Sequence, residues 1–242
     1  MTDIASVAIE TSCRRGGVAL GIGERLVATA EFDASARHAT QLVGRLDELL
    51  TAAGLRPADL SEVYVSVGPG SFTGTRVGVT VARTLAQAVG SLRCVAVPSP
   101  AAVAEAARTL PWQRLGVVLD AREGLVHATF FARRGRRIVQ VGRAGVMSPA
   151  ELLARAERPI VLLGEGLGYH DLRGDGITIP AAESPDAPPH VPTAAGVWRL
   201  GRRLAAAGGY TDFHRLLPVY CRKPAAVRAW EQRRRGSGEG SR

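Results

Sequence analysis

Residues 68–78 of this chain read Gly-Pro-Gly-Ser-Phe-Thr-Gly-Thr-Arg-Val-Gly. They follow a β-branched run, 63–67, that is typical of a buried strand, and they precede a helical stretch that runs to about Val89 and is closed by Gly90. A strand, a glycine-rich turn and a helix in this order aim unpaired backbone N–H groups at an anion. Most glycine-rich turns only allow a tight backbone, so the loop alone is equally consistent with an anion site and with an ordinary turn.

The helix after this loop carries two stripes of residues spaced by four. The first is smooth, because it consists of the small residues Gly74, Gly78, Ala82 and Ala86. The second consists of larger apolar residues: Val77, Val81, Leu85 and Val89. A smooth stripe lets another backbone approach closely. The sequence leaves two partners open for it, namely the helix's own sheet and a helix of another chain.

Length and composition indicate a two-domain globular chain. Its 242 residues fit two domains of about 100 residues each. Hydrophobic residues make up 46%, yet no apolar run approaches the ~20 residues of a membrane span, and no secretory signal is visible. Cys13, Cys94 and Cys221 are odd in number and lack metal-ligand spacing. We therefore expect a reduced, cytoplasmic protein with no metal site and no membrane contact.

The formal charge of +9 is concentrated near the C-terminus. Residues 222–242 hold seven basic and two acidic side chains, a net charge of +5. Such charge runs are often disordered, so we expect a solvated, disordered tail over 228–242. The tail can hold RNA loosely through its phosphates, but it offers little sequence readout.

The first half of the chain predicts an actin-like lobe. Strands are expected over 4–9, 18–22 and 26–32, and the first turn holds Glu10, Thr11 and Ser12. Three opening strands with an acid in the first turn resemble the actin/Hsp70/sugar-kinase class, in which this turn holds nucleotide phosphates. A helix over 36–53 begins near His38, but Leu42 stands where a second metal-binding histidine would be.

The second half repeats this plan. Strands are expected over 115–119, 126–132 and 138–146, with Asp120 at the first turn. Ser148 and Glu151 form a capping box around a short helix, and Thr193 caps a final helix. We therefore predict a two-lobed α/β fold with an N-terminal lobe over 1–104 and a C-terminal lobe over 105–227.

With these motifs in view, the chain resembles the TsaB (YeaZ-type) family over nearly its whole length. The strongest match is the 68–78 motif. Supporting matches are Glu10-Thr11-Ser12, His38, Asp120-Ala121-Arg122, and Pro218-x-Tyr220-x-Arg222. Cys221 and the basic tail depart from the family pattern. So does Glu10, since an aspartate is usual there in the wider actin-like class.

The resemblance implies a non-catalytic subunit, not an enzyme, that binds TsaD and supports formation of N6-threonylcarbamoyladenosine at position 37 of tRNAs reading ANN codons. TsaD carries the chemistry through a His-x-x-x-His helix, whereas this chain has only His38. The resemblance also implies the TsaE ATPase as a partner, a homodimer when the chain is alone, and only weak or indirect contact with tRNA. It implies no cofactor in the isolated chain and leaves open a nucleotide at the partner interface.

The site residues follow from this resemblance and from the stripes. We expect the partner interface on the two helices of the first lobe: His38, Leu42, Arg45, Leu46, Leu49, Gly74, Thr75, Gly78, Ala82 and Ala86. We expect a vestigial phosphate turn at Glu10, Thr11, Ser12, Gly68, Gly70 and Ser71. The alternative function is a stand-alone, ATP-dependent actin-like phosphotransferase or ATPase that uses Glu10 or Asp120 with a metal–nucleotide.

Overall fold

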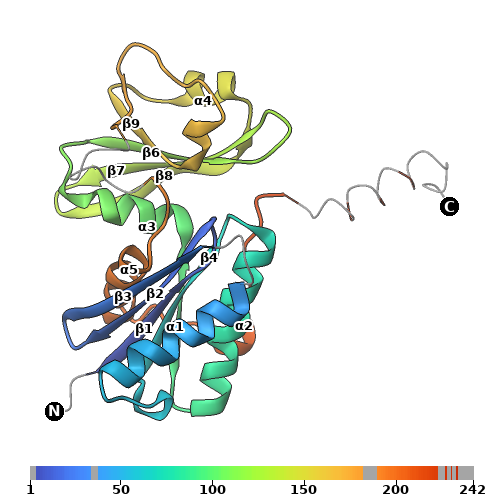
Figure 1. Cartoon of the computed structure of the whole chain (residues 1–242). Coiled ribbons are helices and arrows are strands. Elements are labelled where there is room, and N and C mark those ends of the chain that lie inside the picture. Colours follow the sequence, from blue (N-terminus) through green and yellow to red (C-terminus); the bar gives the residue numbers. More distant parts are fainter. Residues whose placement is uncertain are drawn as a thin grey trace.

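The computed structural model describes residues 4–33, 38–181 and 190–222, together with 227, 230 and 233. These residues form two lobes stacked one above the other, each built on a five-stranded mixed sheet (Figure 1). The two-lobed actin-like α/β fold is confirmed. Most of the predicted tail over 228–242 and residues 182–189 of the loop-rich region lie outside the described residues. No helix in the described part is long and apolar enough to cross a membrane.

The first sheet is centred on its first strand. Its strands are β1 (Ala5–Glu10), β2 (Arg15–Ile22), β3 (Arg25–Asp33), β4 (Glu62–Gly68) and β5 (Arg93–Pro98), in the spatial order β3-β2-β1-β4-β5. β1, β2 and β3 are antiparallel neighbours, whereas β4 and β5 run parallel to β1. Every residue of β1 and β4 is buried, as expected for strands covered on both faces.

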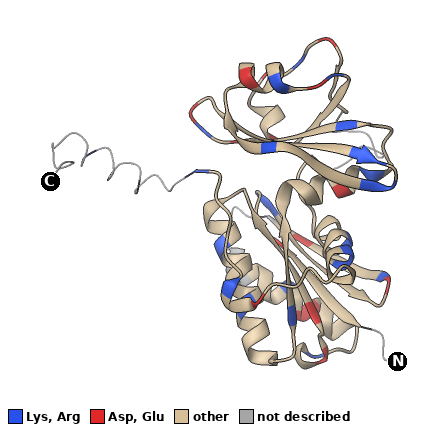
Figure 2. Ribbon diagram, turned by 180° about the vertical axis from the view of Figure 1, so that it is seen from behind, with Lys and Arg blue, Asp and Glu red and all other residues tan. Residues whose placement is uncertain are grey.

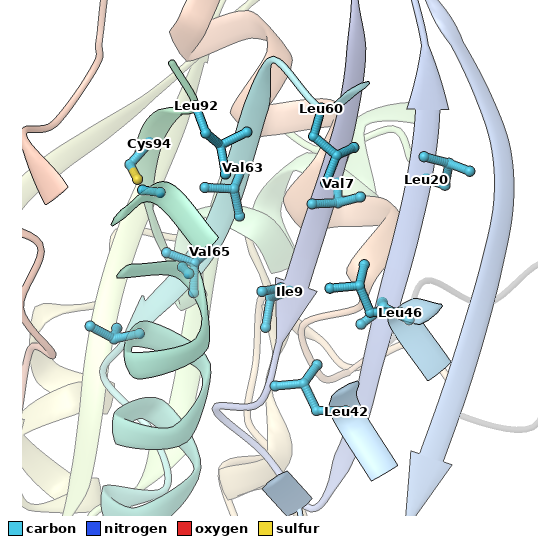
Figure 3. Packing of buried hydrophobic residues seen from close by; sticks show 14 of the residues in the cluster. Val7, Ile9, Leu20, Leu42, Leu46, Leu60, Val63, Val65, Leu92 and Cys94 are labelled. Carbon is cyan, nitrogen blue, oxygen red and sulfur yellow. The ribbon is translucent and has the colours of Figure 1, made fainter. Parts of the chain in front are cut away.

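One face of this sheet is covered by α1 (His38–Ala52) and α2 (Phe72–Val89). Leu42 and Leu46 of α1 meet Val7, Ile9 and Leu20 of the sheet in a continuous apolar cluster (Figure 3). A short 3-10 helix, η1 (Pro57–Asp59), leads into β4. Gly90 ends α2 with a φ of 72°, a conformation that favours glycine.

The opposite face is covered by the final helix, α5 (Ala194–Ala206), which Thr193 caps by accepting a hydrogen bond from the Gly196 N–H. Trp198 of α5 donates from Nε1 to Ser6 Oγ of β1 at 3.0 Å. The segment after α5 contains η4 (Phe213–Arg215), and the Thr211 N–H bonds the Cys94 carbonyl of β5 at 2.8 Å. The prediction that 105–227 all belongs to the second lobe is therefore wrong for α5, since this helix returns to bury the open face of the first sheet.

The second sheet repeats the first strand for strand. It contains β6 (Arg114–Asp120), β7 (Val126–Arg134), β8 (Arg137–Met147), β9 (Ile160–Leu163) and β10 (Ile177–Thr178), in the order β10-β9-β6-β7-β8. β6, β7 and β8 are antiparallel neighbours, and β9 runs parallel to β6. Read from its other edge, this order matches that of the first sheet, and β6 takes the place of β1.

Helices cover both faces of the second sheet. α3 (Ser99–Ala106) and η2 (Ala107–Thr109) connect the two lobes, and Val103 and Ala107 pack on Leu115 of β6. α4 (Pro149–Arg155) lies on the other face with the expected capping box of Ser148 and Glu151. The segment between β9 and β10 contains η3 (Glu165–Gly168).

Candidate functional site

The loop between β4 and α2 forms the start of a helix, as the sequence predicts. Gly68 adopts a φ of 98° and is followed by a cis bond to Pro69. Ser71 caps α2, and its Oγ accepts a hydrogen bond from the Gly74 N–H at 3.1 Å. One of the N–H groups that could hold an anion is therefore satisfied within the loop.

The first turn of the chain closes over this loop. The Ser71 N–H donates to the Ser12 carbonyl at 2.6 Å. A Cβ atom on Gly70 would lie 2.2 Å from that same carbonyl oxygen, and one on Gly74 would lie 1.9 Å from the Thr11 carbonyl oxygen. These glycines are required because the chain's own backbone approaches them too closely for any side chain.

The structure thus brings together the residues predicted as a vestigial phosphate turn: Glu10, Thr11, Ser12, Gly68, Gly70 and Ser71. The N–H groups of Ser71 and Gly74 point at protein oxygens, so they are not free for a phosphate. Two of the backbone donors that an anion site would need are therefore already satisfied by the chain itself.

The predicted partner interface needs correction. The smooth stripe of α2 packs on the chain's own sheet: a Cβ on Gly78 would lie 2.3 Å from Thr11 Oγ1 and 3.3 Å from Ile9 Cγ2. The seven residues that the structure buries inside the chain are Leu42, Leu46, Gly74, Thr75, Gly78, Ala82 and Ala86. Their assignment to a docking surface is wrong, because the chain's own residues already pack against these positions.

The other three predicted interface residues differ from these. Arg45 is exposed and pairs with Glu48 at 2.7 Å, and Leu49 is half-buried. His38 begins α1, but its side chain lies outside the described residues. The outward side of α1 instead carries Val43, which is 54% exposed, and Phe72 at the start of α2 is 40% exposed. The half-buried Val77, Val81 and Leu85 of α2 pack against the core.

Sequence reasoning missed a second exposed apolar group near the start of α2. The Val219 N–H donates to the Val67 carbonyl at 2.7 Å, which lays residues 217–220 along the end of β4. Tyr220 packs on Phe72 with ring centroids 4.8 Å apart, and Leu217 and Val219 are exposed beside them. The Pro218-x-Tyr220-x-Arg222 motif marked this segment in the sequence. Its position beside α2 depends on the long-range contact with Val67, which the sequence does not reveal.

Glu10 is completely buried at the end of β1. Its Oε1 accepts hydrogen bonds from the Ser12 N–H at 2.5 Å and from Ser12 Oγ at 2.6 Å. Its Oε2 has no hydrogen-bond partner among the described residues, and neither has Thr11 Oγ1. Burial raises the pKa of Glu10, with hydrogen bonds from Ser12 opposing that shift.

Asp120 ends β6 at the position that corresponds to Glu10. Its side chain is 11% exposed, and it begins a turn in which Arg122 and Glu123 adopt positive φ values. It contacts Arg122 at 3.5 Å and His170 Nε2 at 3.4 Å. Arg222 donates to the Ala121 carbonyl at 2.8 Å and to Glu123 at 2.6 Å. The 219–222 segment therefore contacts the first-lobe loop and the second-lobe turn together.

No group of three or more histidine, cysteine or acidic side chains that could hold a metal ion occurs in the described ranges. The three cysteines are unpaired, and burial raises the pKa of Cys94 to about 11. Burial is also the main cause of a raised pKa at Cys13 and Cys221. None of these thiols is set up as a reactive thiolate.

Two duplicated mixed sheets, each with an acid at the end of its first strand, define the two-lobed actin-like class of proteins. Within this class, residues 32–164 match the family model described as TsaD: tRNA N6-adenosine threonylcarbamoyltransferase. The chain belongs to this family, and within it to the TsaB (YeaZ) type.

Three relatives illustrate the match. The tRNA threonylcarbamoyladenosine biosynthesis protein TsaB of Bacillus subtilis is 28% identical over 227 residues, covering 93% of this chain and 96% of that protein. The tRNA N6-adenosine threonylcarbamoyltransferase of Anaeromyxobacter dehalogenans is 34% identical over 90 residues, which are 37% of this chain and 24% of that one. The structure of YeaZ from Pseudomonas aeruginosa superposes with a TM-score of 0.75 at 24% identity, covering 90% of this chain and 99% of that chain.

The buried stripe predicts that Gly78→Leu unfolds the chain at a lower temperature. The new side chain has to displace Thr11 and Ile9, and overpacking of this kind costs about 1–3 kcal/mol. Gly44→Ala on α1 is the matched control, because nothing lies within 4 Å of its added Cβ and alanine favours a helix by up to about 1 kcal/mol. Thermal melting of both variants checks this, and a Gly78→Leu variant as stable as the native chain would contradict the packing.

The buried carboxyl predicts a pH-dependent effect of Glu10→Gln. Because the folded chain binds the Glu10 proton more tightly than the unfolded chain, the native free energy of unfolding falls as pH rises above the ordinary glutamate pKa, near 4.5. Glutamine copies the protonated carboxyl, so the variant should melt at a higher temperature than the native chain at pH 7, with the difference vanishing near pH 4. Melting curves across this range test it, with the exposed Glu31→Gln as control. A variant that is less stable than the native chain by the same margin at every pH would show that burial does not raise the pKa of Glu10.

Proposed function

We propose that this chain is a non-catalytic subunit that binds TsaD and supports formation of N6-threonylcarbamoyladenosine at position 37 of tRNAs that read ANN codons. Family membership supports the pathway. The observation that carries the non-catalytic role is the closed first turn, in which the Ser12 carbonyl accepts the Ser71 N–H at the place where an active member of this class would hold phosphate. Four residues after His38 stands Leu42, a hydrocarbon side chain that packs in the core and has no atom that could ligate a metal.

Reconstitution tests this function directly. The purified chain alone should neither hydrolyse ATP nor transfer the threonylcarbamoyl group, whereas adding TsaD and the TsaE ATPase should restore transfer to tRNA. Glu10→Gln should leave the activity of the reconstituted complex unchanged, since we assign Glu10 no chemical step. Robust turnover by the isolated chain that Glu10→Gln abolishes would support the phosphotransferase alternative and overturn the proposal.

We place the TsaD-binding surface on the outward faces of α1 and α2, not on the smooth stripe. These faces hold the exposed apolar side chains of Val43 on α1 and Phe72 at the start of α2. Exposed apolar side chains on two neighbouring helices are the kind of surface that a partner helix buries. The same surface is available for a homodimer when TsaD is absent.

The docking surface predicts that Val43→Arg weakens binding to TsaD at least tenfold, about 1.4 kcal/mol, because it places a charge in an apolar contact. Val27→Arg is the matched control, because Val27 is 48% exposed and belongs to β3, not to either helix. Binding of each variant to TsaD by calorimetry checks this. Equal affinity of the two variants would remove α1 from the interface.

A further inference from the structure

The hairpin of β7 and β8 is the most one-sidedly charged element of the second lobe. Residues 126–147 contain five arginines and no acidic residue: Arg133, Arg134, Arg136, Arg137 and Arg143. In Figure 2 these basic positions gather at the right-hand end of the upper sheet, on the opposite side from the start of the C-terminal tail. The proposed function assigns no role to this charge.

One of these arginines has a structural role. Arg133 lies over the Trp112 ring, 4.6 Å from its centroid, and donates to the carbonyls of Arg108 and Leu110 at 2.8 and 3.0 Å. It anchors the hairpin on the segment after α3. We therefore do not count Arg133 among the groups that could bind a ligand.

The tip of the hairpin holds like charges against each other. Arg134 and Arg137 are directly opposite in the antiparallel register, joined by a two-residue turn in which Gly135 has a φ of 59°. Directly opposed side chains have Cβ atoms about 4.5–5.5 Å apart, and like charges there repel. Arg134, Arg136 and Arg137 are all exposed, and none has an ion pair with any other described residue.

Two acidic groups whose arginine partners lie on or bond neighbouring segments are already neutralised. Glu105 is buried and holds both Arg108, at 2.8 Å, and Arg203, at 2.5 Å. Arg108 in turn donates to the Arg136 carbonyl at 2.6 Å, which fixes the turn beside this paired acid. Glu157 is bound to Arg114 at 3.0 Å. The hairpin tip therefore keeps its positive charge, which a bound anion would compensate.

We propose that the Arg134–Arg137 hairpin tip is a binding site for the phosphate backbone of the tRNA substrate. Guanidinium groups bind phosphate oxygens in a two-pronged geometry, and such contacts position a nucleic acid without reading its sequence. The identity of the RNA rests on the proposed function, whereas the charge arrangement does not.

The surroundings of the tip favour RNA over a protein or a membrane. The cores of stable protein interfaces are enriched in aromatic and other large apolar side chains, and amphipathic membrane-surface elements insert such side chains. Among the described residues, no large exposed hydrophobic side chain lies between 126 and 147. Phosphate contacts need no such anchor, and the exposed charges alone suffice for them.

Arg134→Gln with Arg137→Gln tests the site in the full chain. The control is Arg155→Gln with Arg173→Gln, which removes two exposed arginines from the same lobe and leaves the hairpin and the C-terminal tail unchanged. Titration with an unmodified tRNA transcript should show about tenfold weaker binding for the hairpin pair at ~0.1 M salt. The slope of log K against log salt should fall by about one for each arginine removed, and the control should bind as the native chain does.

A second measurement separates binding from folding and chemistry. The hairpin pair should melt no earlier than the native chain, since it loses a repulsion. In the complex with TsaD it should raise the KM for tRNA and leave kcat unchanged. Equal weakening by both pairs, or no change by the hairpin pair, would overturn the site. So would loss of binding to vesicles of anionic lipid without loss of tRNA binding. A complex that fails to modify tRNA at all would contradict the proposed function instead, and the titration with tRNA would still decide the hairpin.

Discussion

The close approach of the first turn to the start of α2 is the contact on which the first lobe depends. This contact is possible only because residues 70, 74 and 78 are glycines. The backbone of residues 11–12 and the side chain of Thr11 occupy the space where Cβ atoms at these positions would lie. β1 lies at the centre of its sheet, so fixing α2 against the end of β1 orients the helix relative to every other strand. α1 can then pack beside α2 over Ile9 and Leu20, which closes the apolar cluster of Figure 3.

Local chemistry made much of this fold predictable. The strands, the capping box of Ser148 and Glu151, the Thr193 cap and the Gly90 end of α2 are each encoded within a few residues, and each is confirmed. The repetition of three strands with an acid at the first turn also predicted the duplicated lobes, whose sheets have matching strand orders. The glycines of the 68–78 motif also predicted a close backbone contact at this loop, because glycine is favoured where another backbone approaches closely.

What the sequence could not decide was which backbone comes close. A stripe at Gly74, Gly78 and Ala82 fits the chain's own sheet and another chain equally well, because four-residue spacing describes one face of a helix without naming its neighbour. The return of α5 to the first sheet was hidden for a similar reason. Its buried Trp198 could have packed on either lobe, and only the contact with Ser6, at the other end of the chain, settles the choice. The arginines of the β7–β8 hairpin are evident in the sequence, but only the strand register shows that Arg134 and Arg137 lie directly opposite each other.

The two acids at the ends of β1 and β6 show how one plan has been used in two ways. Glu10 lies under its turn with one carboxylate oxygen unpaired, in surroundings that favour the protonated, uncharged form. Asp120 is mostly but not fully buried, and it contacts the side chains of Arg122 and His170. Because the Glu10 carboxyl is sealed behind the backbone of its own turn, it does not face an open site. The 219–222 segment bonds Val67 at the end of β4 and Ala121 in the turn beside Asp120, so it joins the two lobes by contacts within the chain. The positions of the two turns relative to each other are therefore fixed by this segment as well as by the connecting helix α3.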